Sequence, residues 1–216
     1  MIAATTATVF GLQMLNYPVT AGTSGHLIGG ALAAALLGPA WGLLSVTVVL
    51  TVQALLFADG GLTALGTNVT LMAVVGVLVG WAVSRGVVAL ARDDGRRPEV
   101  RALAPAAAAA GGAAGVLAAA AAFVGLYAVG GTVGVPLGAL TAQMLGVHAL
   151  VAVGEAVITG AVVAVVAALR PDAVALTAPD GVPARAGAGV PASALGGLAA
   201  LAAVVLSSVA AATPDG

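Results

Sequence analysis

Apolar stretches long enough to cross a lipid bilayer recur along this chain, and they restrict its possible folds more than any other feature. A helix of about 20 apolar residues crosses the roughly 30 Å hydrocarbon layer of a membrane. Within lipid, the backbone polar groups of such a stretch must be satisfied inside the segment, which favours helices. We therefore predict an all-α membrane protein, a polytopic bundle of six to seven transmembrane helices.

Composition agrees with this class, because only 7% of the 216 residues are charged, whereas a soluble domain has about 25%. The second predicted helix is too short to cross alone, since about 12 residues rise roughly 18 Å. The predicted helices are Ile2–Leu15, His26–Leu37, Ala40–Phe57, Leu65–Leu90, Ala102–Ala128, Ala139–Leu169 and Ala192–Ala212.

Positive charge gathers in two predicted loops, one between the fourth and fifth helices and one between the sixth and seventh. These loops are two crossings apart and share a side, which the positive-inside rule makes cytoplasmic. If the second helix counts as a crossing, the arginine-free loops at 16–25, 58–66 and 129–138 open outward. We therefore expect a multi-pass protein of the cell (plasma) membrane. The arginines are Arg85, Arg92, Arg96, Arg97, Arg101, Arg170 and Arg185.

The absence of certain residue types excludes several kinds of chemistry. The chain has no cysteine, which rules out disulfides, thiolate metal sites and a cysteine nucleophile. It has no lysine and hence no P-loop lysine, so a nucleotide-driven step would need a partner chain. The net charge of −1 gives no nucleic-acid footprint.

The loop before the second predicted helix carries the main candidate metal ligand, His26. Its imidazole stands at the mouth of an apolar segment, where it is suited to a soft-to-borderline divalent metal. Glycines around it allow backbone groups to approach closely, and Asn16 and Ser24 are candidates to support the loop. This loop predicts metal capture from the outside.

Asp59 and Asn68 flank the next arginine-free loop. Asp59 lies in an Asp-Gly-Gly sequence, where its carboxylate either accepts from the backbone of its own turn or orients the imidazole of His26. We expect Asn68 to support the same loop.

His148 and Glu155 lie seven residues apart, on one face of the sixth predicted helix. We favour a buried polar pair that holds helices in register. Direct metal ligation and a proton relay are the alternatives. Gln13, Gln53 and Gln143 are expected to form interhelical hydrogen bonds.

Small residues fill the helix faces, with pairs of glycines four residues apart at Gly25–Gly29, Gly76–Gly80 and Gly111–Gly115. Such pairs let backbones approach closely in lipid. We interpret them as packing within the chain rather than as a dimerisation signal.

Three blocks of sequence carry a resemblance to a known family. They are Asn16-Tyr-Pro-Val with Gly22-Thr-Ser-Gly-His26-Leu, then Ala54–Gly66 followed by Asn68, and His148–Gly160. They resemble the CbiM/NikM family, the substrate-capture (S) components of energy-coupling factor transporters for cobalt and nickel. The resemblance runs from the start to Leu169, and the ending Thr-Pro-Asp-Gly resembles the start of a PDGLE module.

The resemblance implies a fold, a ligand set and partners. The family has six helices plus an extra N-terminal one, and its metal ligands are the amino terminus and histidine of a Met-His-Ile-x-Asp-Gly start together with the histidine that matches His26. A transmembrane coupling protein, two ATPase subunits and a small CbiN-like or PDGLE subunit are the implied partners. Co(II) or Ni(II) is then a transported substrate, with no permanent cofactor. No histidine precedes His26 here, so we expect a chain shortened at both ends.

The predicted organisation is a transmembrane metal-capture domain at 1–169, a cytoplasmic linker at 170–191 and an appended transmembrane helix at 192–216. The function predicted is non-enzymatic: the metal-capture subunit of an ATP-driven importer. One alternative is an intramembrane serine protease that uses Ser24 and His148 as a dyad. Another is a structural membrane subunit that transports nothing.

Overall fold

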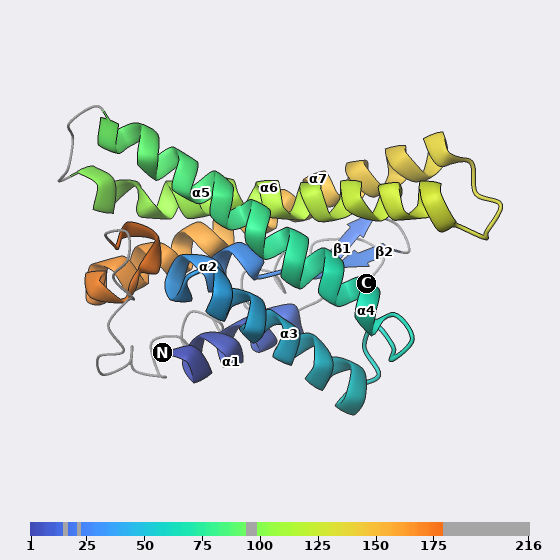
Figure 1. The fold of residues 1–216 in the computed structure, drawn as a ribbon, viewed down its shortest axis with the longest axis horizontal. Helices are drawn as coiled ribbons and strands as arrows, with labels where there is room; N and C mark the ends of the chain where they lie inside the picture. The colour runs from blue at the N-terminus through green and yellow to red at the C-terminus, as the bar shows by residue number, and fades with distance from the viewer. Residues whose placement is uncertain (15–16, 21–22, 94–98, 179–216) are drawn as a thin grey trace.

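A computed structural model of the chain describes residues 1–14, 17–20, 23–93 and 99–178. These residues form a bundle of helices with one short hairpin (Figure 1). The elements are α1 (Ile2–Gln13), β1 (Tyr17–Thr20), β2 (Thr23–Gly25), α2 (Gly30–Leu37), α3 (Pro39–Leu56), α4 (Leu65–Asn68), the π-helix η1 (Val69–Val75), α5 (Gly76–Asp93), α6 (Glu99–Gly130), α7 (Leu137–Leu169) and the 3₁₀ turns η2 (Pro171–Ala173) and η3 (Ala175–Thr177).

Four helical stretches are long and apolar enough to cross a membrane: Pro39–Leu56, Leu65–Ala91, Arg101–Gly130 and Leu137–Leu169. The predicted class, an all-α membrane protein, is confirmed by these spans. With 12 residues, α1 is shorter than a crossing, and α2 has only eight. The predicted helix at 192–212 lies outside the described residues.

Residues 17–25 contain a short antiparallel hairpin where the sequence predicts only loop. Tyr17 pairs with Gly25, and Pro18 pairs with Ser24. β-branched residues such as Val19, Thr20 and Thr23 favour extended backbone, and pairing satisfies backbone groups that a loop would leave open. Strands of four and three residues are too short to show a clear alternation of apolar and polar side chains, so the sequence could not reveal the hairpin.

The long helices lie side by side, and the shorter ones pack against them. α6 contacts both α5 and α7, while α2 contacts α3 and α5. Figure 1 shows α1, α2 and α3 below the layer that α5, α6 and α7 form. α2 is buried from Gly30 to Leu36, so this eight-residue helix is shielded by protein.

Two of the three predicted glycine pairs, Gly76–Gly80 and Gly111–Gly115, meet each other between α5 and α6. A methyl group added at Gly115 would lie 2.7 Å from the carbonyl oxygen of Gly76, and one added at Gly80 would lie 3.2 Å from that of Gly111. Side chains at these crossings would force the helices apart. For these two pairs, the interpretation as packing within the chain is confirmed.

The ends of the bundle differ in charge. Arg85 on α5 donates through Nη1 to the carbonyl oxygen of Leu176 in η3, 3.0 Å away, so the C-terminal half of α5 and the segment after α7 lie at one end of the bundle. Figure 1 shows the α6–α7 connection at the opposite end, together with the turn that follows α3.

Candidate metal-binding cavity

The site is built on a non-helical segment, residues 26–29, between the hairpin and α2. It ends at Gly29, which precedes the first residue of α2 and has a left-handed backbone (φ +68°). A Cβ there would lie 2.9 Å from Cγ1 of Val9. Both the backbone conformation and the close approach of α1 therefore require glycine at this position.

Two buried polar side chains bind the backbone of the 26–29 segment. The amides of Ile28 and Gly29 each donate to one carboxyl oxygen of Glu155, both at 2.8 Å. Gln13 donates through Nε2 to the carbonyl oxygen of Ile28, 2.6 Å away. Non-helical backbone at membrane depth is tolerated only where protein satisfies its polar groups. Here α7 supplies the acceptors and α1 supplies the donor.

One ring nitrogen of His26 contacts the backbone of the next residue. Its Nδ1 lies 3.0 Å from the carbonyl oxygen of Leu27. Because a carbonyl oxygen only accepts, Nδ1 carries the proton in this contact, and the lone pair of Nε2 is left available. Metal-ligating histidines commonly have their other ring nitrogen tied to a carbonyl in this way.

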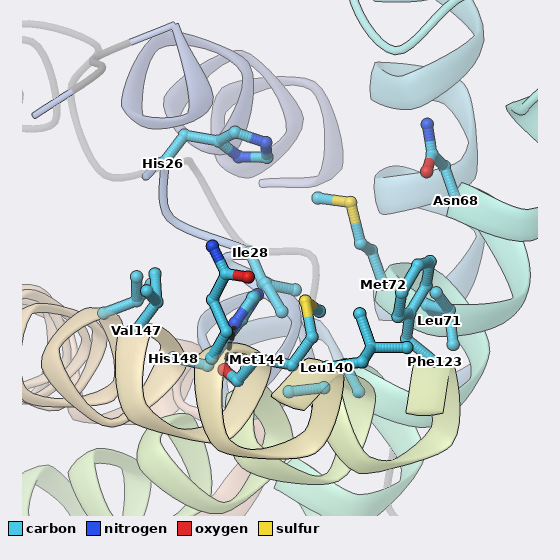
Figure 2. Close-up of a pocket in the computed structure, with 14 residues that line it drawn as sticks. His26, Ile28, Asn68, Leu71, Met72, Phe123, Leu140, Met144, Val147 and His148 are labelled. Carbon is cyan, nitrogen blue, oxygen red and sulfur yellow. Dashed lines mark hydrogen bonds between the residues drawn. The ribbon is translucent and has the colours of Figure 1, made fainter. Parts of the chain in front are cut away.

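A cavity of about 460 Å³ lies beside this imidazole, and both histidines of the chain line it. Figure 2 shows His26 above the cavity, His148 and Met144 on α7 below it, and Met72 and Asn68 on the helix to the right. Spacings of three and four residues from Leu140 to Val151 place one face of α7 along the cavity. The π-helix η1 contributes another wall, as such irregular helices often do at functional sites.

The other predicted support residues lie in different places. Asn68 lines the cavity, and its Nδ2 lies so close to Gly60 that a Cβ there would be only 2.5 Å away. Asp59 is exposed and outside the lining, and its backbone amide donates to the carbonyl oxygen of Gln53 (3.2 Å). Ser24 is in β2, with a side chain outside the description, and Asn16 is outside the described residues.

His148 and Glu155 have different hydrogen-bond partners although they share a face of α7. Nδ1 of half-buried His148 lies 2.7 Å from the carbonyl oxygen of Met144 one turn earlier. Glu155, buried at 1% exposure, accepts from the 26–29 segment. Sequence reasoning missed the second contact, for which a single sequence contains no signal. The contact of His148 with the Met144 carbonyl could have been predicted, because the two residues are four apart on one helix.

Within the described ranges, no three side chains of histidine, cysteine, aspartate or glutamate converge on one point. A metal at His26 would therefore need further donors of another kind, such as backbone nitrogen, thioether, amide or water. Imidazole is a ligand for borderline cations such as Ni(II) and Co(II).

The fold and the cavity define a class, a multi-pass helical membrane protein with an imidazole beside a cavity. Residues 1–173 match the family described as CbiM, cobalt uptake substrate-specific transmembrane region. The chain belongs to this family, as the sequence resemblance predicts.

Curated relatives and solved structures agree with this assignment. The chain is 41% identical over 168 residues to a putative fused nickel transport protein NikMN of Archaeoglobus fulgidus, an alignment that covers 77% of this chain and 52% of the relative. It is 38% identical over 174 residues to a putative metal transport protein of Haloquadratum walsbyi, covering 80% and 73%. It therefore spans about half the length of the first relative. A crystal structure of a transition metal transporter superposes with a TM-score of 0.66 at 32% identity, covering 78% and 75%.

These relatives are named transport proteins, and the family is a transport family rather than an enzyme family. The serine protease alternative is therefore set aside.

Proposed function

We propose that this chain is the substrate-capture subunit of an ATP-driven importer for Co(II) or Ni(II), and that it binds the ion at the outer face through Nε2 of His26. The observation that carries the proposal is the hydrogen bond from Nδ1 of His26 to the Leu27 carbonyl, which leaves Nε2 as a lone-pair donor beside a cavity. Family membership supports the choice of metal.

The support of the 26–29 segment by α1 and α7 fits a capture role. Glu155 and Gln13 bind the backbone of Ile28 and Gly29, so the chain directly after His26 is anchored at two sides. A ligand held in advance loses less conformational freedom when the ion binds. Asn68 in the cavity wall and the outer-loop residues Asp59, Ser24 and Asn16 are proposed to support the same loop.

The importer would need other chains. We propose a transmembrane coupling protein, two ATPase subunits and a small CbiN-like or PDGLE subunit as partners. The name of the fused Archaeoglobus relative joins two components in one chain, which supports a CbiN-like partner. The arginine-bearing end would face the cytoplasm in the plasma membrane, according to the positive-inside rule.

Uptake of radioactive nickel or cobalt by cells that produce the complete transporter tests the proposal. His26→Ala should abolish uptake, whereas Thr51→Ala, a change on α3 outside the cavity lining, should leave it nearly unchanged. Unchanged uptake in His26→Ala at normal protein levels would contradict the proposal.

A further inference from the structure

His148 is the second imidazole of the cavity, and like His26 it has Nδ1 against a backbone carbonyl oxygen. Its Nδ1 lies 2.7 Å from the carbonyl oxygen of Met144. Since that oxygen only accepts, the proton is on Nδ1 and the lone pair is on Nε2. His148 also lines the cavity. The helix backbone therefore fixes the tautomer that a metal requires.

Two thioethers accompany this imidazole. Met72 on η1 and Met144 on α7 both line the cavity, and Figure 2 shows the Met72 side chain extending toward the space between η1 and the 26–29 segment. Thioether and imidazole donors select soft and borderline transition metals, whereas Mg²⁺ and Ca²⁺ prefer oxygen. This part of the lining therefore suits the same class of cation as His26.

The cavity is large enough for more than a bare ion. A water molecule occupies about 30 Å³ in the liquid, and the cavity has about 460 Å³. An ion inside could keep several of its waters while one or two protein donors bind it. A site with few protein ligands holds its ion weakly, as expected of a position that the ion occupies only briefly during transport.

We propose that Nε2 of His148, with the thioethers of Met72 and Met144, forms a second binding position for Ni(II) or Co(II) in the cavity wall formed by α7 and η1. His26 and His148 lie on opposite sides of the same cavity (Figure 2), and the ion would reach this position from the capture ligand His26. The proposal rests on the proposed function for the identity of the cation. The geometry of His148 supports it independently of His26.

The chain allows a clean test, because it has two histidines and no cysteine. The full chain is purified without a histidine tag, and Ni(II) binding is measured by equilibrium dialysis and by X-ray absorption at the nickel edge. His26→Ala should retain a weaker bound ion with nitrogen and sulfur neighbours. Adding His148→Ala, which removes every imidazole, should weaken this binding by about tenfold or more.

Replacing the methionines by leucine distinguishes the loss of a metal ligand from a loss of folding. In the His26→Ala background, Met72→Leu with Met144→Leu should remove the sulfur neighbour and weaken binding. Met14→Leu, a matched change outside the cavity lining, should do neither. Circular dichroism checks the helix content of each variant, and His148→Gln replaces His148→Ala if the latter unfolds.

Equal Ni(II) binding with and without His148 in the His26→Ala background would overturn the proposal, as would an absorption spectrum with no sulfur neighbour. The two proposals fail separately. Uptake that survives His26→Ala refutes capture at His26 and leaves the His148 position standing. If no bound Ni(II) depends on His148, the second position is refuted and the proposal of capture at His26 still stands.

Discussion

Replacing Glu155 tests whether a buried carboxyl group holds the 26–29 segment in place. In the native structure its two oxygens accept the amides of Ile28 and Gly29, both at 2.8 Å. Glu155→Ala leaves both donors buried without a partner. Glu155→Gln keeps one acceptor oxygen and turns an NH₂ group toward the other amide.

The magnitude follows from the number of unsatisfied donors. Each buried group left without a partner costs about 1–3 kcal/mol, so Glu155→Ala should lower the free energy of unfolding by about 2–6 kcal/mol and Glu155→Gln by about half as much. Interhelical hydrogen bonds in membranes often contribute less, about 0.6 kcal/mol, because the unfolded helices find other partners. The larger range is expected here, because the Ile28 and Gly29 amides lie in the non-helical 26–29 segment and have no carbonyl of their own helix to bind.

Reversible unfolding in mixed detergent micelles, followed by circular dichroism, measures these differences. Thr47→Ala is the matched control, because the Thr47 hydroxyl bonds the carbonyl of Leu43 on the same helix and its removal exposes no backbone donor. The control should stay within about 0.5 kcal/mol of wild type. If Glu155→Ala also stays within that range, Glu155 does not hold the segment and the reasoning is refuted.

Three further predictions concern other parts of the chain. Gly29→Ala should destabilise the protein by about 1–3 kcal/mol in the same unfolding assay, because its φ of +68° is left-handed; equal stability would contradict this. Gly115→Val should reduce the yield of folded protein in gel filtration, since even a methyl group there would lie 2.7 Å from the Gly76 carbonyl oxygen; a normal yield would show that α5 and α6 can separate. The exposed Arg170 guanidinium lowers the pKa of Asp172, so the stabilisation by this pair is complete above the usual carboxyl range and is lost as the pH falls through the lowered value. Because exposed pairs contribute little, Asp172→Asn should leave Tm unchanged at neutral pH, and a clear drop would refute that view.

The sequence predicts the long helices well, because uninterrupted apolar runs leave few other structures possible in lipid. The predicted range Leu65–Leu90 is observed as Leu65–Ala91, and Ala139–Leu169 as Leu137–Leu169. The glycine pairs between α5 and α6 were predictable for the same reason, since small residues four apart mark close helix contacts. The pattern of neighbouring residues is therefore enough to predict both the long helices and the glycine contacts between them.

The cavity could be predicted only in part. His26 was recognisable by its position in a polar loop, but the contact between Glu155 and Ile28 joins residues 127 positions apart. No periodicity reports such a pairing. The sequence places His148 and Glu155 on one face but cannot say that one lines a cavity and the other binds backbone. The different surroundings of His148 and Glu155 depend on where α2 begins. Gly29, which lies against Val9 of α1, directly precedes the first residue of α2.

Anomalous diffraction from crystals soaked in a nickel or cobalt salt tests the central claim most directly. The account predicts an anomalous peak about 2 Å from Nε2 of His26, the length of an imidazole–metal bond, and no such peak in His26→Ala crystals. A fully occupied ion elsewhere in the chain, with no peak beside the His26 ring, would contradict it.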